Sequence, residues 1–390
     1  MQVGTVQQTP INFRNAGIAA ALEENVFLNK ALLDATADVQ FVWFSNNKVE
    51  RKERLRRVLW NYTLVFLSPF VTLPLTNKLA MKYIAKLTPK LTSKENNLIH
   101  ISNKFLRDKE SLKEGIKLLS KEKNTDYSKI IEKCGGDYEI LRKKLINAKN
   151  SVLSFDFFFS TGSVVGMAFL NNALTKKKTN MDGYSAEFEL VDREKVEKRA
   201  SKYKKSEPLR KGITAGLVGL LTLLPLAIKR GLISDKTTGF SGFIKRHADK
   251  FDYTSGKFMK RLPLFMFLTG AMTGVALASR NRTEVKNNLV INSMGLTIYF
   301  GGDLLLNSLL AKFSDKFLKT QIVDNTAPKT FINKIVSPTV PIKKLSGKSQ
   351  KIAKINFLVN FITLAIVYGY GMPHIINKIV RKDLKNDKTV

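Results

Sequence analysis

The sequence has very few of the residues that build disulfides, metal sites or redox centres. Its 390 residues include one cysteine, three histidines and two tryptophans. A lone cysteine, Cys134, cannot form an intramolecular disulfide, and no His or Cys residues stand at the spacing of a zinc ligand pair. We therefore expect no metal and no cofactor.

Catalytic motifs and a secretion signal are also missing. The chain contains no P-loop, no G-x-G-x-x-G after a strand, no H-E-x-x-H and no G-x-S-x-G, so nothing in it supports an enzyme. Residues 1–15 lack a basic stretch followed by an apolar core, which argues against a cleavable signal peptide. We expect the first membrane span to direct insertion itself.

Positive charge, in contrast, is abundant. The chain has 65 Lys and Arg against 32 Asp and Glu, a formal net charge of +33. Such a charge attracts polyanions, either nucleic acid or anionic lipid headgroups. A nucleic-acid role would need a recognisable basic module, and the sequence shows none. We therefore expect anionic lipid, and not nucleic acid, as a partner.

The mean hydropathy of -0.11 hides an alternation of apolar and Lys-rich stretches. Six apolar stretches come close to the length of about 20 residues that crosses a bilayer as a helix. A buried helix of a soluble protein would show a polar stripe, and residues 217–228 show almost none. The sequence therefore predicts an all-α transmembrane bundle of about six spans. The predicted spans are 58–80, 151–174, 212–233, 262–279, 288–311 and 355–377.

The segments outside the spans are basic on both sides, so charge asymmetry does not fix an orientation. Residues 1–57 are predicted to form an amphipathic, basic segment that faces lipid headgroups, with a solvated basic helix as the alternative. Its basic cluster is Arg51, Lys52, Arg54, Arg56 and Arg57. The remaining segments are a helical insertion (81–150), a charged loop (175–211), a basic loop (234–261), a Pro- and Lys-rich loop (312–354) and a basic tail (378–390).

Two predicted spans share the pattern F-x-F-x-T-G-x-x-x-G-x-A, which begins at Phe157 and again at Phe265. The span before each of them contains Leu-Pro-Leu followed by Lys, around Pro74 and Pro225. A Pro-bearing span followed by a Gly-bearing span thus occurs twice, which predicts an internal repeat of the kind common in transporters. Chance likeness between apolar segments is the alternative.

Small residues and prolines mark positions where the predicted spans pack or bend. Glycines one turn apart let two helices approach closely, and prolines remove a helical hydrogen bond. The predicted packing glycines are Gly162, Gly166, Gly212, Gly216, Gly270 and Gly274. The predicted kinks are at Pro74, Pro225 and Pro373.

Polar residues inside predicted spans are the candidates for a site. Asp303 lies deep in its span, with Asn307 one turn further on, and Asp156 lies near the end of another span. A carboxylate in a span suggests an ion or proton pathway, because burying an unpaired charge in lipid is costly. The alternative is a carboxyl that is hydrogen-bonded to a neighbouring helix or protonated. His374 is a further polar candidate because it follows Pro373.

The sequence therefore favours transport or conduction of a small solute or ion, with a site near Asp303. The alternative is a structural membrane protein whose basic loops hold anionic lipid or an acidic partner. The two functions differ in what they require, because transport depends on the acidic residues of the spans and a scaffold depends on the basic cluster.

Overall fold

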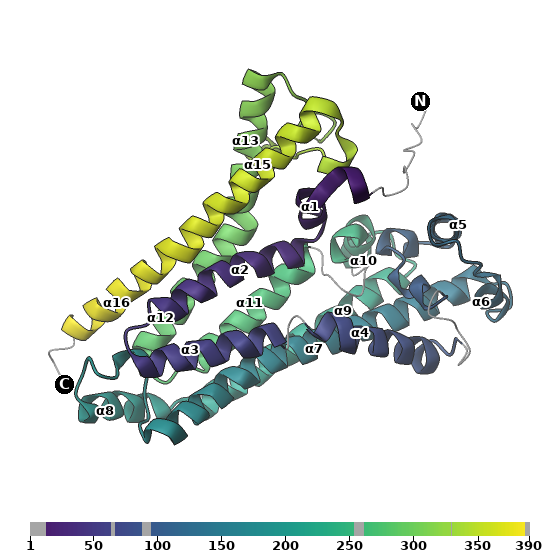
Figure 1. Cartoon of the computed structure of the whole chain (residues 1–390). Helices are drawn as coiled ribbons and strands as arrows, with labels where there is room; N and C mark the ends of the chain where they lie inside the picture. The colour runs from purple at the N-terminus through teal and green to yellow at the C-terminus, as the bar shows by residue number, and fades with distance from the viewer. Residues whose placement is uncertain (1–12, 64–66, 88–94, 253–260, 329, 387–390) are drawn as a thin grey trace.

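The computed structural model describes residues 13–63, 67–87, 95–252, 261–328 and 330–386 (Figure 1). These residues are almost entirely helical and contain no strand. An isolated antiparallel bridge joins Val323 to Thr339. The predicted all-α class is confirmed.

Within these described ranges, four continuous helical stretches are long and apolar enough to cross a membrane, judged by length and composition. Two are the single helices α7 (Tyr138–Thr179) and α9 (Glu207–Ile233). The other two are each made of two helices joined by a π-helical segment. Their parts are α12 (Arg282–Thr297), η7 (Ile298–Gly302) and α13 (Asp303–Leu318), then α15 (Gly347–Ile366), η9 (Val367–Gly371) and α16 (Met372–Asn386).

Four such stretches are fewer than the six spans predicted. Residues 262–279 form α11 (Arg261–Leu277), which has 17 residues and falls just short of a span. The predicted span 58–80 is divided between α3 (Lys48–Asn61) and α4 (Leu67–Leu79), and residues 64–66 lie outside the described part of the chain. Helix α3 is rich in Lys and Arg, so an apolar window that begins at Val58 covers only its end.

Shorter helices complete the molecule. Helices α1 (Phe13–Glu24) and α2 (Val26–Trp43) precede α3. The predicted helical insertion 81–150 contains α5 (Lys109–Lys123) and α6 (Ser128–Glu132) as well as the first turns of α7. The remaining helices are α8 (Arg193–Lys204), α10 (Gly239–Arg246) and α14 (Phe331–Ile335).

Several connections between helices lie together at one end of the bundle, here named the turn end, and hydrogen bonds join them. Asn47, between α2 and α3, donates to the carbonyl oxygens of Ser185 and Phe188, both at 2.7 Å. Arg210 at the start of α9 donates to the carbonyl of Ser279, between α11 and α12, at 2.6 Å. In Figure 1 the turn end lies at the lower left, with α8 and the end of α16.

The opposite end of α7 holds a second group of segments, at the right of Figure 1. There Arg142 donates to the carbonyls of Leu106 and Leu232, each at 3.0 Å. Because α7 and α9 run between the two groups in opposite directions, the loops on either side of each helix lie at different ends. This arrangement is what helices that cross a membrane in turn require.

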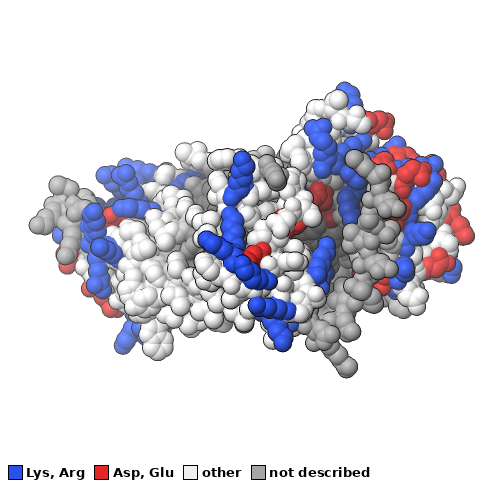
Figure 2. Space-filling model, turned by 90° about the horizontal axis from the view of Figure 1, so that it is seen from above, with Lys and Arg blue, Asp and Glu red and all other residues white. Residues whose placement is uncertain are grey.

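Large apolar side chains remain exposed on the outside of the long helices. Examples are Leu220 and Leu223 on α9 and Ile355, Leu358 and Ile362 on α15. Figure 2 shows charged residues gathered mainly at two ends of the molecule, with a largely uncharged surface between them that a band of basic side chains crosses. A contiguous exposed apolar surface of this kind is unfavourable in water, and it is compatible with contact to the hydrocarbon of a bilayer.

The predicted packing glycines fall into two groups. A Cβ atom at Gly270 would collide with Leu221 of α9, and one at Gly274 would collide with Val165 of α7. A Cβ atom at the other four glycines, Gly162, Gly166, Gly212 and Gly216, would meet nothing within 4 Å.

The predicted kink positions all lie in helices. Pro74 is inside α4, Pro225 is inside α9 and Pro373 is the second residue of α16.

Candidate functional site

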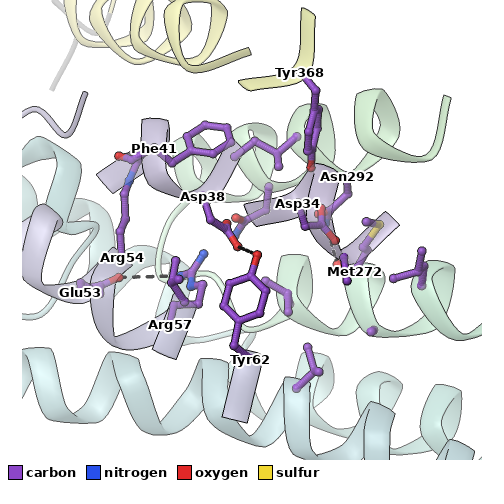
Figure 3. Close-up of a pocket in the computed structure, with 18 of the residues that line it drawn as sticks. Asp34, Asp38, Phe41, Glu53, Arg54, Arg57, Tyr62, Met272, Asn292 and Tyr368 are labelled. Atoms are coloured by element: carbon purple, nitrogen blue, oxygen red, sulfur yellow. Dashed lines mark hydrogen bonds and ion pairs between the residues drawn. The ribbon is translucent and has the colours of Figure 1, made fainter. Parts of the chain in front are cut away.

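A cavity of about 240 Å³ lies between α2, α3, α11 and α12, with one residue of η9 closing it (Figure 3). Two of its sides differ in chemistry. The acidic wall comes from α2 and α3 and contains Asp34, Asp38, Glu50 and Glu53, together with the basic residues Lys30, Arg54 and Arg57. The apolar wall comes from α11 and contains Leu264, Phe267, Leu268, Ala271, Met272 and Val275.

Helix α2 places two carboxylates of the acidic wall one turn apart. The side chain of Asn25 caps the helix by accepting a hydrogen bond from the backbone of Leu28 at 3.1 Å. Residues 30, 34 and 38 then share one face, because positions four apart lie above one another on a helix. Asp34 and Asp38 are half-buried and line the cavity.

Tyrosine hydroxyls donate hydrogen bonds to these two carboxylates, and Lys30, Arg54 and Arg57 act on them through charge alone. Tyr62 donates to Asp38 at 3.2 Å. Tyr299 donates to Asp34, and the hydroxyl of Tyr368 is also hydrogen-bonded to Asp34. Among the described residues no Lys or Arg forms an ion pair with either carboxylate.

The three tyrosines all lie in π-helical turns. Tyr299 belongs to η7, Tyr368 belongs to η9 and Tyr62 lies in a π-helical turn that follows α3. A π turn is wider than an α turn, so it changes the direction of the side chains that follow it, and such turns are frequent at functional sites. Three separate helices therefore depart from α geometry where they reach the same pair of carboxylates.

Asp303, the main candidate from the sequence, lies next to this group. Its carboxylate accepts hydrogen bonds from Lys30 at 2.9 Å and from Asn360 at 2.8 Å. Lys30 is only 2% exposed and is one turn before Asp34 on α2. Asp303 is thus balanced by a buried lysine. Asn307, predicted to share its site, donates instead to Thr339 at 3.3 Å.

A network of ion pairs closes the cavity toward the turn end. Arg280 contacts both oxygens of Glu53, at 3.0 and 2.7 Å, and also contacts Glu284 at 2.9 Å. Burial alone would raise the pKa of Glu53, but Arg280, Arg57 and Thr175 together outweigh burial and hold that pKa below its usual value. Burial, helped by Glu50, raises the pKa of Tyr184 to about 12, so its hydroxyl stays neutral.

The charges around the cavity do not balance. With the adjacent Asp303 and Arg280 included, six carboxylates meet four basic groups, although the whole chain carries a charge of +33. Glu50, Glu53, Glu284 and Asp303 each form an ion pair with an Arg or Lys. Burial raises the pKa of Asp34 above its ordinary value and raises the pKa of Asp38 to about 6. A cation bound between these two carboxyl groups would favour their charged forms.

Other predicted site residues lie elsewhere. Asp156 is buried in α7, accepts a hydrogen bond from Ser160 at 3.2 Å and does not line the cavity. His374 is exposed, and its ring packs against Phe44 with ring centres 5.0 Å apart.

The predicted basic cluster divides between surface and interior. Arg51 and Lys52 are exposed. Arg54 and Arg57 line the cavity, and Arg56 donates to Asn171 of α7 at 2.9 Å.

Sequence reasoning missed Asp34, Asp38 and the tyrosines. The signal that could have found the carboxylates is the spacing of Lys30, Asp34 and Asp38, which places three charges on one face of an otherwise uncharged 18-residue helix. No pattern in the sequence around the tyrosines predicts that they contact these carboxylates. In the part of the chain that the structure describes, no group of three His, Cys, Asp or Glu residues could hold a metal ion.

Comparison with known proteins identified no relative of this chain. No family model, no curated protein and no solved structure matches this chain.

Proposed function

We propose that this chain is a multi-pass membrane protein that moves a small cationic solute or ion across the membrane by way of the cavity between α2, α3, α11 and α12. One observation carries the proposal: Asp34 and Asp38 line the cavity one turn apart, and tyrosine hydroxyls donate hydrogen bonds to them. Groups kept in an energetically unfavourable state inside a fold are candidates for function.

Six passes are part of this proposal. The four long stretches supply four passes, and the shorter helices in 58–80 and 262–279 supply the other two. We expect single cysteines, in a chain with Cys134→Ser, to react with an impermeant thiol reagent from opposite sides in two groups. The first group is Ser201→Cys and Thr283→Cys, and the second is Ser120→Cys, Ser241→Cys and Ser346→Cys. Labelling of all five from one side would contradict six passes.

Transport itself is tested in proteoliposomes. The purified protein is reconstituted, and the uptake of radiolabelled or dye-reported cations, both organic and inorganic, is compared between the wild type and the double variant Asp34→Asn/Asp38→Asn. Asparagine keeps an oxygen that accepts from tyrosine but removes the charge. We expect uptake to fall about ten- to hundredfold, because a hydrogen bond to a charged group contributes about 1.5–3 kcal/mol.

A matched control is Asp192→Asn, since the Asp192 side chain is 83% exposed and is not among the residues that line the cavity. This variant should transport like the wild type. Absence of any cation flux in correctly oriented wild-type protein would contradict the proposal. The scaffold function would then replace it, with the exposed Arg51 and Lys52 as contacts for anionic headgroups.

A further inference from the structure

We propose that the ligand of the cavity is a small organic ammonium ion, with its charged group at Asp34 and Asp38 and its hydrocarbon part against α11. This inference rests on the transport function proposed above and names the class of substrate. It also assigns a separate role to each of the two walls of the cavity.

The size of the cavity is the first argument. An enclosed apolar cavity of about 150 Å³ admits a molecule as large as benzene. The cavity here measures about 240 Å³, which is far more than a bare metal ion or a proton occupies. It therefore has room for a ligand with several non-hydrogen atoms.

The arrangement of the walls is the second argument. An ammonium group carries several N–H donors, and two carboxylates one turn apart offer acceptors for them. Phe267, Leu268 and Met272 on the apolar wall offer contact to a hydrocarbon chain but no charge. A hydrated inorganic cation would leave these apolar side chains facing water, whereas an alkylammonium ion satisfies both walls.

The aromatic residues are the third argument. Tyr62 and Tyr368 line the cavity beside the carboxylates, and tyrosine rings attract cations through their negative faces. The protein already holds one alkylammonium group in this way. The Lys30 ammonium lies 2.9 Å from Asp303 and 5.8 Å from the centre of the Tyr299 ring.

A buried hydroxyl at the cavity is an independent sign of a ligand. Ser185 lines the cavity and is 1% exposed, and its hydroxyl has no hydrogen-bond partner among the described residues. A buried polar group without a partner is costly, so its presence suggests a partner that comes from outside the chain. A hydroxyl or amine on the far end of the ligand would supply that partner.

The test is a binding series on the full-length protein in detergent. Thermal unfolding is followed with methyl-, ethyl-, propyl- and butylammonium chloride, with potassium chloride at the same ionic strength and with neutral 1-butanol. We expect a saturable rise in the unfolding temperature with the amines alone. Affinity should increase about fourfold with each added methylene, as burial of a methylene predicts.

Variants separate this site from unspecific binding. Asp34→Asn/Asp38→Asn should weaken butylammonium binding at least tenfold, and Asp192→Asn should leave it unchanged. Equal stabilisation by potassium chloride, or affinity that does not depend on chain length, would overturn the inference. So would binding that persists undiminished in the double variant. If butylammonium binds as expected but never crosses a liposome membrane, the transport proposal fails and the ligand class stands.

Discussion

Two groups of polar side chains inside this molecule differ in how their charges are paired. At the end of the bundle opposite the turn end, Lys149 is 3% exposed and donates to Asp252 at 2.8 Å and to the carbonyl of Ile101 at 2.6 Å. Asp252, which is fully buried, also accepts from the backbone of Asn103 at 3.2 Å. One positive and one negative charge meet, and each has further hydrogen bonds.

At the cavity the charges do not meet in this way. Asp34 and Asp38 are only half-buried and have tyrosine hydroxyls as donors. The first arrangement fixes three segments of the chain to one another. The second leaves two carboxyl groups facing a cavity, with tyrosine hydroxyls as their hydrogen-bond donors. The comparison teaches that a buried carboxylate alone says little about function, and that its partners decide whether it holds the fold together or can take up a ligand.

Removal of a charge from the balanced group should have the largest effect on stability. Lys149→Met leaves the carboxylate of Asp252 buried without its cation, and we expect it to lower the free energy of unfolding by about 3–5 kcal/mol. Thermal unfolding in detergent measures the change. Lys143→Met is the matched control, because the Lys143 side chain on the same helix is 50% exposed, and its loss should change stability by about 1 kcal/mol or less. Equal unfolding temperatures for the two variants would show that the buried pair of Lys149 and Asp252 stabilises the fold no more than an exposed lysine does.

Removal of charge from the unbalanced group should have little effect on stability. Asp38→Asn keeps an acceptor for Tyr62 and relieves the repulsion between two carboxylates one turn apart, so we expect the free energy of unfolding to stay the same or rise by about 1 kcal/mol or less. The same unfolding experiment measures it, with Asp252→Asn as the destabilised reference. A loss as large as that of Asp252→Asn would mean that both groups are structural.

A third buried carboxylate gives the smallest expected effect and depends on pH. Burial raises the pKa of Glu187 above its ordinary value of 4.5, although Arg199 and Asn281 oppose the change. Glu187 therefore binds its proton more tightly in the folded state, and stability falls as the pH rises from about 4.5 through the raised pKa.

Glu187→Gln removes this dependence. We expect the variant to exceed the wild type by about 1 kcal/mol or less at neutral pH and to match it at pH 4. Unfolding temperatures across this range measure the difference, and Glu189→Gln, at an exposed position two residues on, should follow the wild type throughout. A difference that grows toward acid pH would contradict the assigned direction of the pKa change.

Much of the fold could be predicted from hydropathy, because a helix that crosses a bilayer must be apolar over its whole length. The stretches in α7, α9, α12–α13 and α15–α16 stand out for that reason. The site could be predicted only in part. Asp303 was identified by its position in a span, but its partner Lys30 is 273 residues away in the sequence. Such pairs are created by packing between distant helices, and no local pattern encodes them.

The wide turns at Tyr299 and Tyr368 have a mechanical consequence. Each of these π-helical turns contains more residues than an α-helical turn of the same height does. Movement of the wide turn along its helix by one residue rotates the residue that it passes by about 100°, the angle between neighbours on an α-helix. Tyr368 or Tyr299 could thus turn away from Asp34 while both ends of its helix stay in place. The hydrogen bond to Asp34 could thus break and form again without any helix having to tilt.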